Sequence, residues 1–155
     1  ELHVVSQYME IQKARLTDRL TLHKEIDESC LDVKIPTLTI QPLVENAVTH
    51  GIEPKVEGGN VWIRIKDNGD SVIVEIEDDG LGMEQEEMEQ ILAERYVNES
   101  DNSNGIGFIN VVKRLRLFYS MDDIIHIESE LSKFTKVVLK VPKKRGESNV
   151  TGVNR

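Results

Sequence analysis

A strand–turn–strand pattern in the middle of the chain constrains its fold more than any other feature. Aliphatic residues recur at every second position over residues 61–66 and again over residues 72–77. Between these runs stands Asp67-Asn68-Gly69-Asp70, a sequence typical of the turn of a β-hairpin. Because a period of two puts every second side chain on the same side, the hairpin has one aliphatic face, and we expect helices to cover it.

Helical periodicity appears on both sides of this hairpin. It predicts a moderately amphipathic helix over residues 2–22 and a second helix over about residues 38–50, with Gly51 as its stop. A third helix is predicted over about residues 106–119. Helices and hairpins in this order, without strand–helix–strand alternation, predict an α+β fold with a mainly antiparallel sheet and helices on one face.

The remaining segments are less regular. Residues 84–104 hold seven acidic residues against one basic residue, a net charge of −6 out of −9 for the whole chain. Apolar spacing around Met88 allows a short helix there, and the turn-forming residues 98–104 predict a mobile loop. Two more strands are expected near residues 124–128 and 135–141, followed by a disordered polar tail over residues 143–155.

Composition excludes several classes of protein. The 155 residues suffice for one domain with one core, and a net charge of −9 argues against general binding of nucleic acid or of anionic membranes. The single cysteine, Cys30, cannot form an internal disulfide, and the four histidines are too dispersed for a zinc site. No apolar run approaches the roughly 18 residues of a membrane span, and the N-terminus lacks the pattern of a signal peptide.

Three short segments are candidates for chemistry. In Asp78-Asp79-Gly80-Leu81-Gly82, after a strand, the glycines let a flat ligand approach and a carboxylate can accept a hydrogen bond from an exocyclic amine. Gly105-Ile106-Gly107 opens a helix, whose free N–H groups suit a phosphate. Glu45 and Asn46 lie on the polar side of their helix, where an amide oxygen suits Mg²⁺ and a carboxylate can position or deprotonate a nucleophile.

Each segment also has an ordinary interpretation. The first is equally an acidic turn, the second a flexible hinge at the end of a loop, and the third a solvated helix face. An EF-hand loop over residues 75–86 is rejected, because residues 72–77 have the periodicity of a strand where the entering helix would end. No P-loop and no H-R-D or D-F-G sequence is present.

Taken together and in this order, the segments resemble the LytS/YesM-type sensor histidine kinases. Residues 41–51 are similar to the N box of that family, residues 78–82 to its D-x-G-x-G box and residues 105–110 to its G-x-G-x-x-N box. The resemblance covers about residues 1–142. It implies the Bergerat fold of gyrase, the Hsp90 chaperones and MutL, a two-layer α/β sandwich with a mainly antiparallel mixed sheet that holds ATP between helices and a lid.

The resemblance implies a role for each matching residue. Asp78 would read the adenine amino group, while Gly80 and Gly82 would shape the adenine pocket and the hinge of a lid formed by residues 84–104. Asn46 would coordinate Mg²⁺, and Glu45 would assist the nucleophile, so these two are the expected catalytic residues. The residues expected around ATP are Asn46, Thr49, His50, Asp78, Gly80, Gly82, Met83, Gly105, Ile106, Gly107 and Thr135.

Three departures from the family pattern stand out. Thr49 replaces a frequent lysine, and the Gly-Thr box near the last strand reads Ser132-Lys133-Phe134-Thr135, with its threonine kept and its glycine lost. The family's phosphoacceptor histidine lies in an upstream P-H-F-x-F-N segment that this sequence lacks. The resemblance therefore implies an excised catalytic domain that binds ATP and Mg²⁺ without phosphorylating itself.

As a whole, the resemblance implies the catalytic domain of a two-component sensor histidine kinase. This enzyme would transfer the γ-phosphoryl group of ATP to a histidine on a separate upstream dimerisation domain, and from there a response regulator would be the partner. The full-length protein would be a dimer and a membrane-bound bacterial sensor, with this domain in the cytoplasm. The expected divisions are a linker helix over residues 1–24, the catalytic domain over 25–142 and the tail over 143–155.

Two other functions stay open from the sequence. The first is a GHKL-type ATPase switch, in which Glu45 would activate water for hydrolysis of ATP. The second is a degenerate interaction module without catalysis, which the loss of the lysine and of the late glycine would fit.

Overall fold

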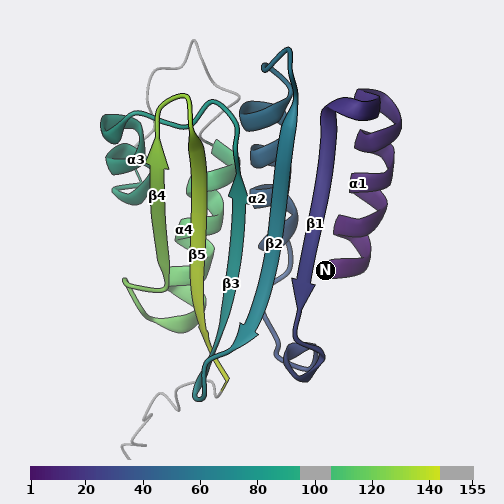
Figure 1. Cartoon of the computed structure of the whole chain (residues 1–155). Helices are drawn as coiled ribbons and strands as arrows, with labels where there is room; N and C mark the ends of the chain where they lie inside the picture. Colours follow the sequence, from purple (N-terminus) through teal and green to yellow (C-terminus); the bar gives the residue numbers. More distant parts are fainter. Residues whose placement is uncertain (95–105, 144–155) are drawn as a thin grey trace, which may run out of the picture.

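The hairpin at the centre of the chain forms the middle of a five-stranded sheet (Figure 1). Strands β2 (Gly59–Asp67) and β3 (Ser71–Asp78) pair antiparallel, and Gly69 in the turn has a φ of 74°, the left-handed conformation that Asn-Gly turns require. The computed structural model describes residues 1–94 and 106–143. The predicted hairpin is therefore confirmed, with each strand slightly longer than its aliphatic run.

Three more strands extend the sheet on both sides. Their order is β1-β2-β3-β5-β4, with β1 (Leu20–Ile26) parallel to β2, and with β5 (Phe134–Pro142) and β4 (Ile125–Glu130) antiparallel to their neighbours. The sheet is thus mixed and mainly antiparallel, as predicted. The two strands expected near residues 124–128 and 135–141 are confirmed, each one or two residues longer.

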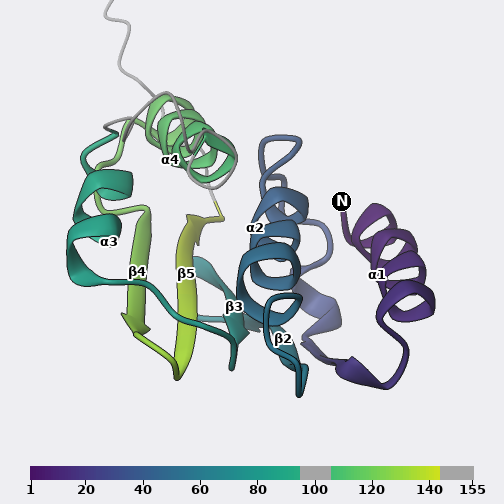
Figure 2. The same ribbon diagram turned by 90° about the horizontal axis from the view of Figure 1, so that it is seen from above.

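In the described residues, four α-helices lie on the same face of this sheet (Figure 2). They are α1 (Leu2–Leu16), α2 (Ile40–Asn46), α3 (Gln85–Leu92) and α4 (Ile106–Tyr119). The aliphatic sides of all five strands pack against them and form one core, in which each fully buried aliphatic side chain contributes roughly 1.5–3 kcal/mol. The α+β fold with helices on one face is confirmed.

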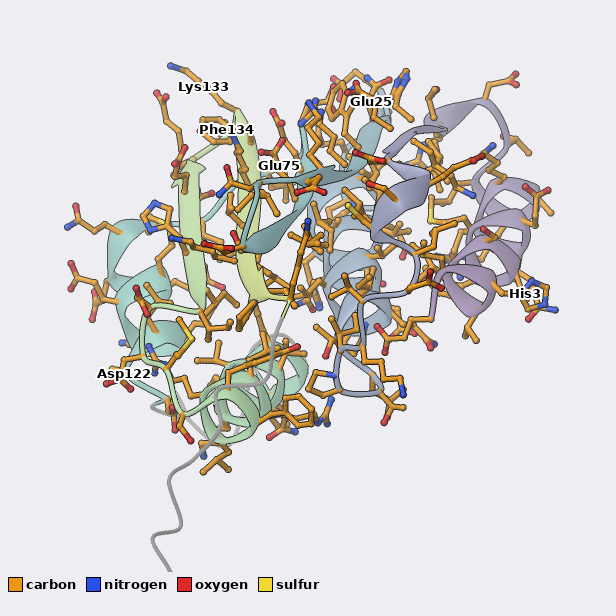
Figure 3. All side chains as sticks on the ribbon, turned by 90° about the horizontal axis from the view of Figure 1, so that it is seen from below. His3, Glu25, Glu75, Asp122, Lys133 and Phe134 are labelled. Atoms are coloured by element: carbon orange, nitrogen blue, oxygen red, sulfur yellow. The ribbon has the colours of Figure 1, made fainter. Side chains whose placement is uncertain are left out.

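Charged side chains cover the other face of the sheet. Arg64 forms ion pairs with Glu75 and with Glu77, the latter over 2.6 Å, and Lys136 reaches Glu75 over 3.2 Å. Figure 3 shows Glu25 and Glu75 pointing away from the helices on this side. Because side chains alternate between the two sides of each strand, the sheet has one apolar face and one charged face.

The predicted helix over residues 2–22 is wrong in its second half. α1 ends at Leu16, Thr17 adopts a φ of 52°, and a short 3₁₀ turn (Thr17–Arg19) leads into β1. Leu20 lies four residues after Leu16, a spacing that predicts the same apolar face of the helix. It is instead the first residue of a strand, where pairing with β2 satisfies the backbone.

The second predicted helix is also different in detail. α2 continues directly into η3 (Ala47–Ile52), a wider turn with the hydrogen bonding of a π-helix. Gly51 is therefore not the stop of the helix, and its φ is not left-handed. A second short 3₁₀ turn (Glu28–Cys30) lies between β1 and α2.

The other sequence predictions divide into tested and untested ones. The helix over residues 106–119 and the short helix near Met88 are both confirmed. The loop at 98–104 and all but the first residue of the predicted tail lie outside the described residues. Within the described part, no helix has the length and apolar character to cross a membrane.

Candidate functional site

A cavity of about 250 Å³ opens between the α2–η3 segment, the sheet and α3. Apolar side chains from α2, β3, α3, α4 and β5 form most of its walls. A mostly apolar cavity with a few convergent polar groups is typical of sites for small molecules and cofactors. The polar side chains among its lining residues are Asn46, His50, Asp78, Glu87 and Thr135.

Asp78 is the most deeply buried carboxylate of this cavity. It is the last residue of β3, is 3% exposed, and accepts a hydrogen bond of 3.0 Å at Oδ1 from the N–H of Gly80. Burial raises the pKa of Asp78 to about 7, while the Gly80 hydrogen bond lowers it and the neighbouring Asp79 raises it further. A buried carboxylate with so few partners is suited to accept a hydrogen bond from a ligand.

Two glycines allow close packing around the Asp78 carboxylate. A Cβ on Gly51 would lie 2.3 Å from Asp78 Oδ1, and a Cβ on Gly80 would lie 2.3 Å from the backbone of Gly51. The Leu81 N–H also donates to the Gly51 carbonyl over 3.1 Å. The loop after β3 thus packs directly on η3, and Gly51 serves this close approach.

The adjacent Asp79 points away from the cavity and anchors this loop to β2. Its carboxylate accepts hydrogen bonds from the backbone N–H of Asn60 over 2.6 Å and from the Asn60 side chain over 2.8 Å. Lys55 donates to the Asp79 carbonyl over 2.6 Å. The two neighbouring acids therefore have different tasks, and Asp78 alone lines the cavity.

Asn46 and His50 line the cavity from the α2–η3 segment. Asn46 is the last residue of α2 and His50 lies one turn later in η3, so both line the cavity. Burial lowers the pKa of His50, which keeps its imidazole neutral near pH 7. This wall therefore offers an amide and a neutral ring to a ligand.

Glu45 and Thr49 face α1 and do not line the cavity. Glu45 accepts a hydrogen bond of 2.8 Å from the Gln41 side chain, and Thr49 is hydrogen-bonded to the hydroxyl of Tyr8 in α1. Burial raises the pKa of Tyr8, and the nearby charge of Glu45 adds to this. Neighbouring helix residues point about 100° apart, which is why Asn46 and Glu45 diverge.

α1 holds this segment along its whole length. The Glu1 carboxylate accepts hydrogen bonds of 2.7 Å from the N–H groups of Thr39 and Ile40, at the start of α2. At the other end, Arg15 forms a two-point ion pair with Glu53 over 2.5 and 2.9 Å. Both ends of α2–η3 are thereby fixed relative to α1.

The other predicted site residues separate into three groups. Gly82, Met83 and Thr135 line the cavity together with Asp78, whereas Gly80 lies behind the Asp78 carboxylate. Ile106 and Gly107, at the start of α4, do not line it, and Ile106 is 38% exposed. Gly105 lies outside the described residues.

Sequence reasoning did not assign most of the apolar lining residues, or Glu87, to the site. Helical periodicity places Phe108 on the apolar side of the helix predicted over residues 106–119, and its position one residue after Gly107 is the signal that links it to the site. Glu87 lies among seven acids, and nothing in the sequence distinguishes it from the others. Burial raises the pKa of Glu87, with a further contribution from Glu84.

The late Gly-Thr departure has a structural counterpart. Ser132 adopts a φ of 63° in the turn between β4 and β5, and its N–H donates to the Leu81 carbonyl over 2.5 Å. The turn therefore keeps a left-handed residue without a glycine. Thr135, the retained residue of that box, lies directly opposite Asp78 on the neighbouring strand.

Solved structures share this fold. The catalytic domain of histidine kinase ThkA, in a nucleotide-free form, matches with a TM-score of 0.67 at 20% identity, over 91% of this chain and 90% of that one. The histidine kinase domain of a blue-light-activated kinase from Erythrobacter litoralis matches with a TM-score of 0.59 at 16% identity, over 89% and 58%. At these identities the likeness concerns the fold alone.

Several sequence relatives are sensor proteins of bacteria. The chain is 37% identical to the sensor histidine kinase YpdA of Escherichia coli, over 94% of this chain and 24% of that protein. It is 33% identical to the sensor protein LytS of Oceanobacillus iheyensis, over 83% and 22%, and 32% identical to the sensor histidine kinase YesM of Bacillus subtilis, over 92% and 23%. The chain thus spans about a quarter of the length of these relatives.

A family model for histidine kinase-, DNA gyrase B- and HSP90-like ATPases matches residues 32–145. This match includes the segments that supply Asn46, Asp78 and Thr135 to the cavity. The chain belongs to the family of histidine kinase-, DNA gyrase B- and HSP90-like ATPases.

Proposed function

We propose that this chain is the ATP-binding catalytic domain of a sensor histidine kinase. The observation that carries the proposal is the cavity into which Asn46, His50, Asp78, Met83 and Thr135 converge from separate segments. Membership in the ATPase family and the likeness to sensor kinases support it.

The adenine end of the proposed site lies at Asp78. Its carboxylate would accept a hydrogen bond from the exocyclic amino group of the base, and Thr135 lies beside it in the sheet register. The apolar walls, with Met83 among them, would contact the faces of the ring. Gly51 leaves room for the carboxylate because a Cβ there would lie 2.3 Å from Asp78 Oδ1, and Gly80 allows the loop after β3 to pack on Gly51.

The phosphate end of the proposed site lies at Asn46 and His50. The described residues contain no cluster of three acidic, histidine or cysteine side chains around a common point. Mg²⁺ usually takes one or two protein oxygens and completes its shell with phosphates and water, so the Asn46 amide oxygen fits as its protein ligand. When bound, Mg²⁺ neutralises phosphate charge and fixes the γ-phosphoryl group for transfer.

Glu45 remains a proposed catalytic residue with a particular geometry. Its carboxylate lies toward α1 and is held by Gln41. A nucleophile assisted by Glu45 would therefore have to approach from the α1 side of α2, next to Thr49 and Tyr8. Gly105, Ile106 and Gly107 are proposed to cap the triphosphate once ATP is bound.

The activity of the longer protein is proposed by analogy with the sensor relatives. The phosphoryl group would pass to a histidine on an upstream dimerisation domain, and then to a response regulator. The full-length protein would be a dimeric, membrane-bound sensor. Positioning and charge neutralisation would provide most of the catalysis.

Calorimetric titration with ATP, with and without Mg²⁺, tests this proposal. The unmodified chain should bind ATP more tightly with Mg²⁺, Asn46→Ala should lose most of the Mg²⁺ dependence, and Asp78→Asn should lose binding under both conditions. Circular dichroism of both variants controls for folding. Absence of ATP binding by the folded unmodified chain, or normal binding by Asp78→Asn, would contradict the proposal.

A further inference from the structure

A row of polar side chains crosses three strands beneath the cavity. In the strand register Ser129 of β4 is opposite Thr135 of β5, and Thr135 is opposite Asp78 of β3. Thr135 and Asp78 line the cavity, while the half-buried Ser129 stands one strand further out. Ser129 belongs to none of the sequence motifs, so its contacts need a separate explanation.

The Ser129 hydroxyl has three polar neighbours. Its Oγ lies 2.8 Å from the backbone nitrogen of Met83, 2.6 Å from the carbonyl oxygen of Phe134 and 3.0 Å from Oγ1 of Thr135. A hydroxyl has one proton to donate and two lone pairs to accept with. Three neighbours therefore fill its capacity completely.

The chemistry of these neighbours fixes the direction of every proton. The Met83 N–H can only donate, so Ser129 accepts there, and the Phe134 carbonyl can only accept, so Ser129 donates its one proton there. Thr135 must then be the donor in its contact with Ser129. The Thr135 proton points away from the cavity, and its oxygen offers lone pairs to a ligand.

We infer that Ser129 is a specificity-determining residue that acts by positioning the Thr135 hydroxyl. With the Thr135 proton engaged, the floor of the cavity presents acceptors: the Thr135 oxygen and the Asp78 carboxylate. Hydrogen-bond acceptors in the floor favour adenine, whose edge carries an amino group that can donate. They disfavour guanine, which carries a carbonyl oxygen at the same position. The inference rests on the proposed function, since it assumes that a purine nucleotide occupies this cavity.

Ser129 also ties the cavity wall to the sheet. Its bond to the Met83 N–H fixes the end of the loop after β3, where a Cβ on Gly82 would lie 2.1 Å from the Glu130 carbonyl. Loss of the hydroxyl would loosen this wall and weaken the binding of every nucleotide. The ratio of affinities for two purines is therefore the informative readout.

The experiment compares ATP with GTP, each with Mg²⁺, by calorimetry. Ser129→Ala should lower the preference for ATP over GTP by about fivefold to tenfold, because the freed Thr135 proton can turn toward a carbonyl oxygen. Ser129→Thr keeps the hydroxyl and should keep the preference. Ser71→Ala is the matched control, because this buried serine accepts a bond from Asn68 at the other end of β3.

A double-mutant cycle separates positioning from general loosening. On a Thr135→Val background, Ser129→Ala should leave the ATP-to-GTP ratio unchanged, because there is no hydroxyl left to orient. An unchanged ratio in Ser129→Ala itself, with normal ATP binding by the parent chain, would overturn the inference alone. If the folded parent chain binds neither nucleotide, the proposed function fails and the inference falls with it.

Discussion

At the scale of single residues, the site depends on one buried acid between two glycines. Asp78 and Asp79 are adjacent in the sequence, yet one lines the cavity and the other anchors Asn60. Gly51 leaves room for the Asp78 carboxylate, and Gly80 allows the loop after β3 to pack on the Gly51 backbone. Burial without a cationic partner in hydrogen-bond contact is then the cause of the raised pKa of Asp78.

The pKa of Asp78 predicts a pH-dependent stability. The group titrates near pH 7 when folded and near 3.8 ordinarily, so the folded state holds an extra proton between these values. Its contribution is fully present below about pH 4 and is lost as the pH rises through 7. Asp78→Asn should therefore be more stable than the parent chain at pH 8, with the difference shrinking toward pH 4. Urea denaturation at both pH values measures this, and identical pH dependence of the two proteins would contradict it.

At the scale of elements, the sequence predicted those helices and strands that depend on local signals better than those that depend on distant pairing. The hairpin and α4 were predictable, because a turn sequence and a helical stripe are contained in a few consecutive residues. β1 was not, because its parallel pairing with β2 joins Leu20 to Gly59 across a long stretch of chain. The π-helical turn after Asn46 was not predicted, because a glycine such as Gly51 commonly ends a helix. In the structure Gly51 instead leaves room for the Asp78 carboxylate.

The same limit applies to the site. The three motif segments were expected to meet, and two of them do so in the described residues through Asn46 and Asp78. Helical periodicity places Glu45 and Asn46 on the polar side of α2. It cannot tell which flank of that side faces the cavity, and Glu45 faces α1. Ser129 could not be found at all, since its role depends on the register of β4 and β5.

α1 is predicted to be part of the folded unit. Met9 is fully buried at its contact with the core, and Leu→Ala or Met→Ala changes at such sites cost about 2–5 kcal/mol. Met9→Ala should therefore lower the free energy of unfolding by that amount. Ile11→Ala, in the same helix but 65% exposed, is the control and should change it little. Equal effects of the two substitutions in urea denaturation would show that α1 does not pack on the domain.

At the scale of the whole molecule, two cavities of similar size lie at opposite ends of β3. The one at Asp78 has the convergent polar groups, whereas the other, of about 260 Å³, is lined largely by aliphatic residues such as Ile65 and Val141. In the proposed function, a nucleotide occupies the first cavity and contacts α2, β3 and β5 together. The fold allows these contacts because it brings segments that are distant in the sequence to one end of the sheet.

An amide NMR titration with ATP and Mg²⁺ tests that claim most directly. The signals of Asn46, Asp78, Met83 and Thr135 should shift together along one saturation curve, while those of Ile65 and Val141 stay in place. Shifts of Asn46 and Asp78 with different affinities, or shifts confined to the second cavity, would contradict the account.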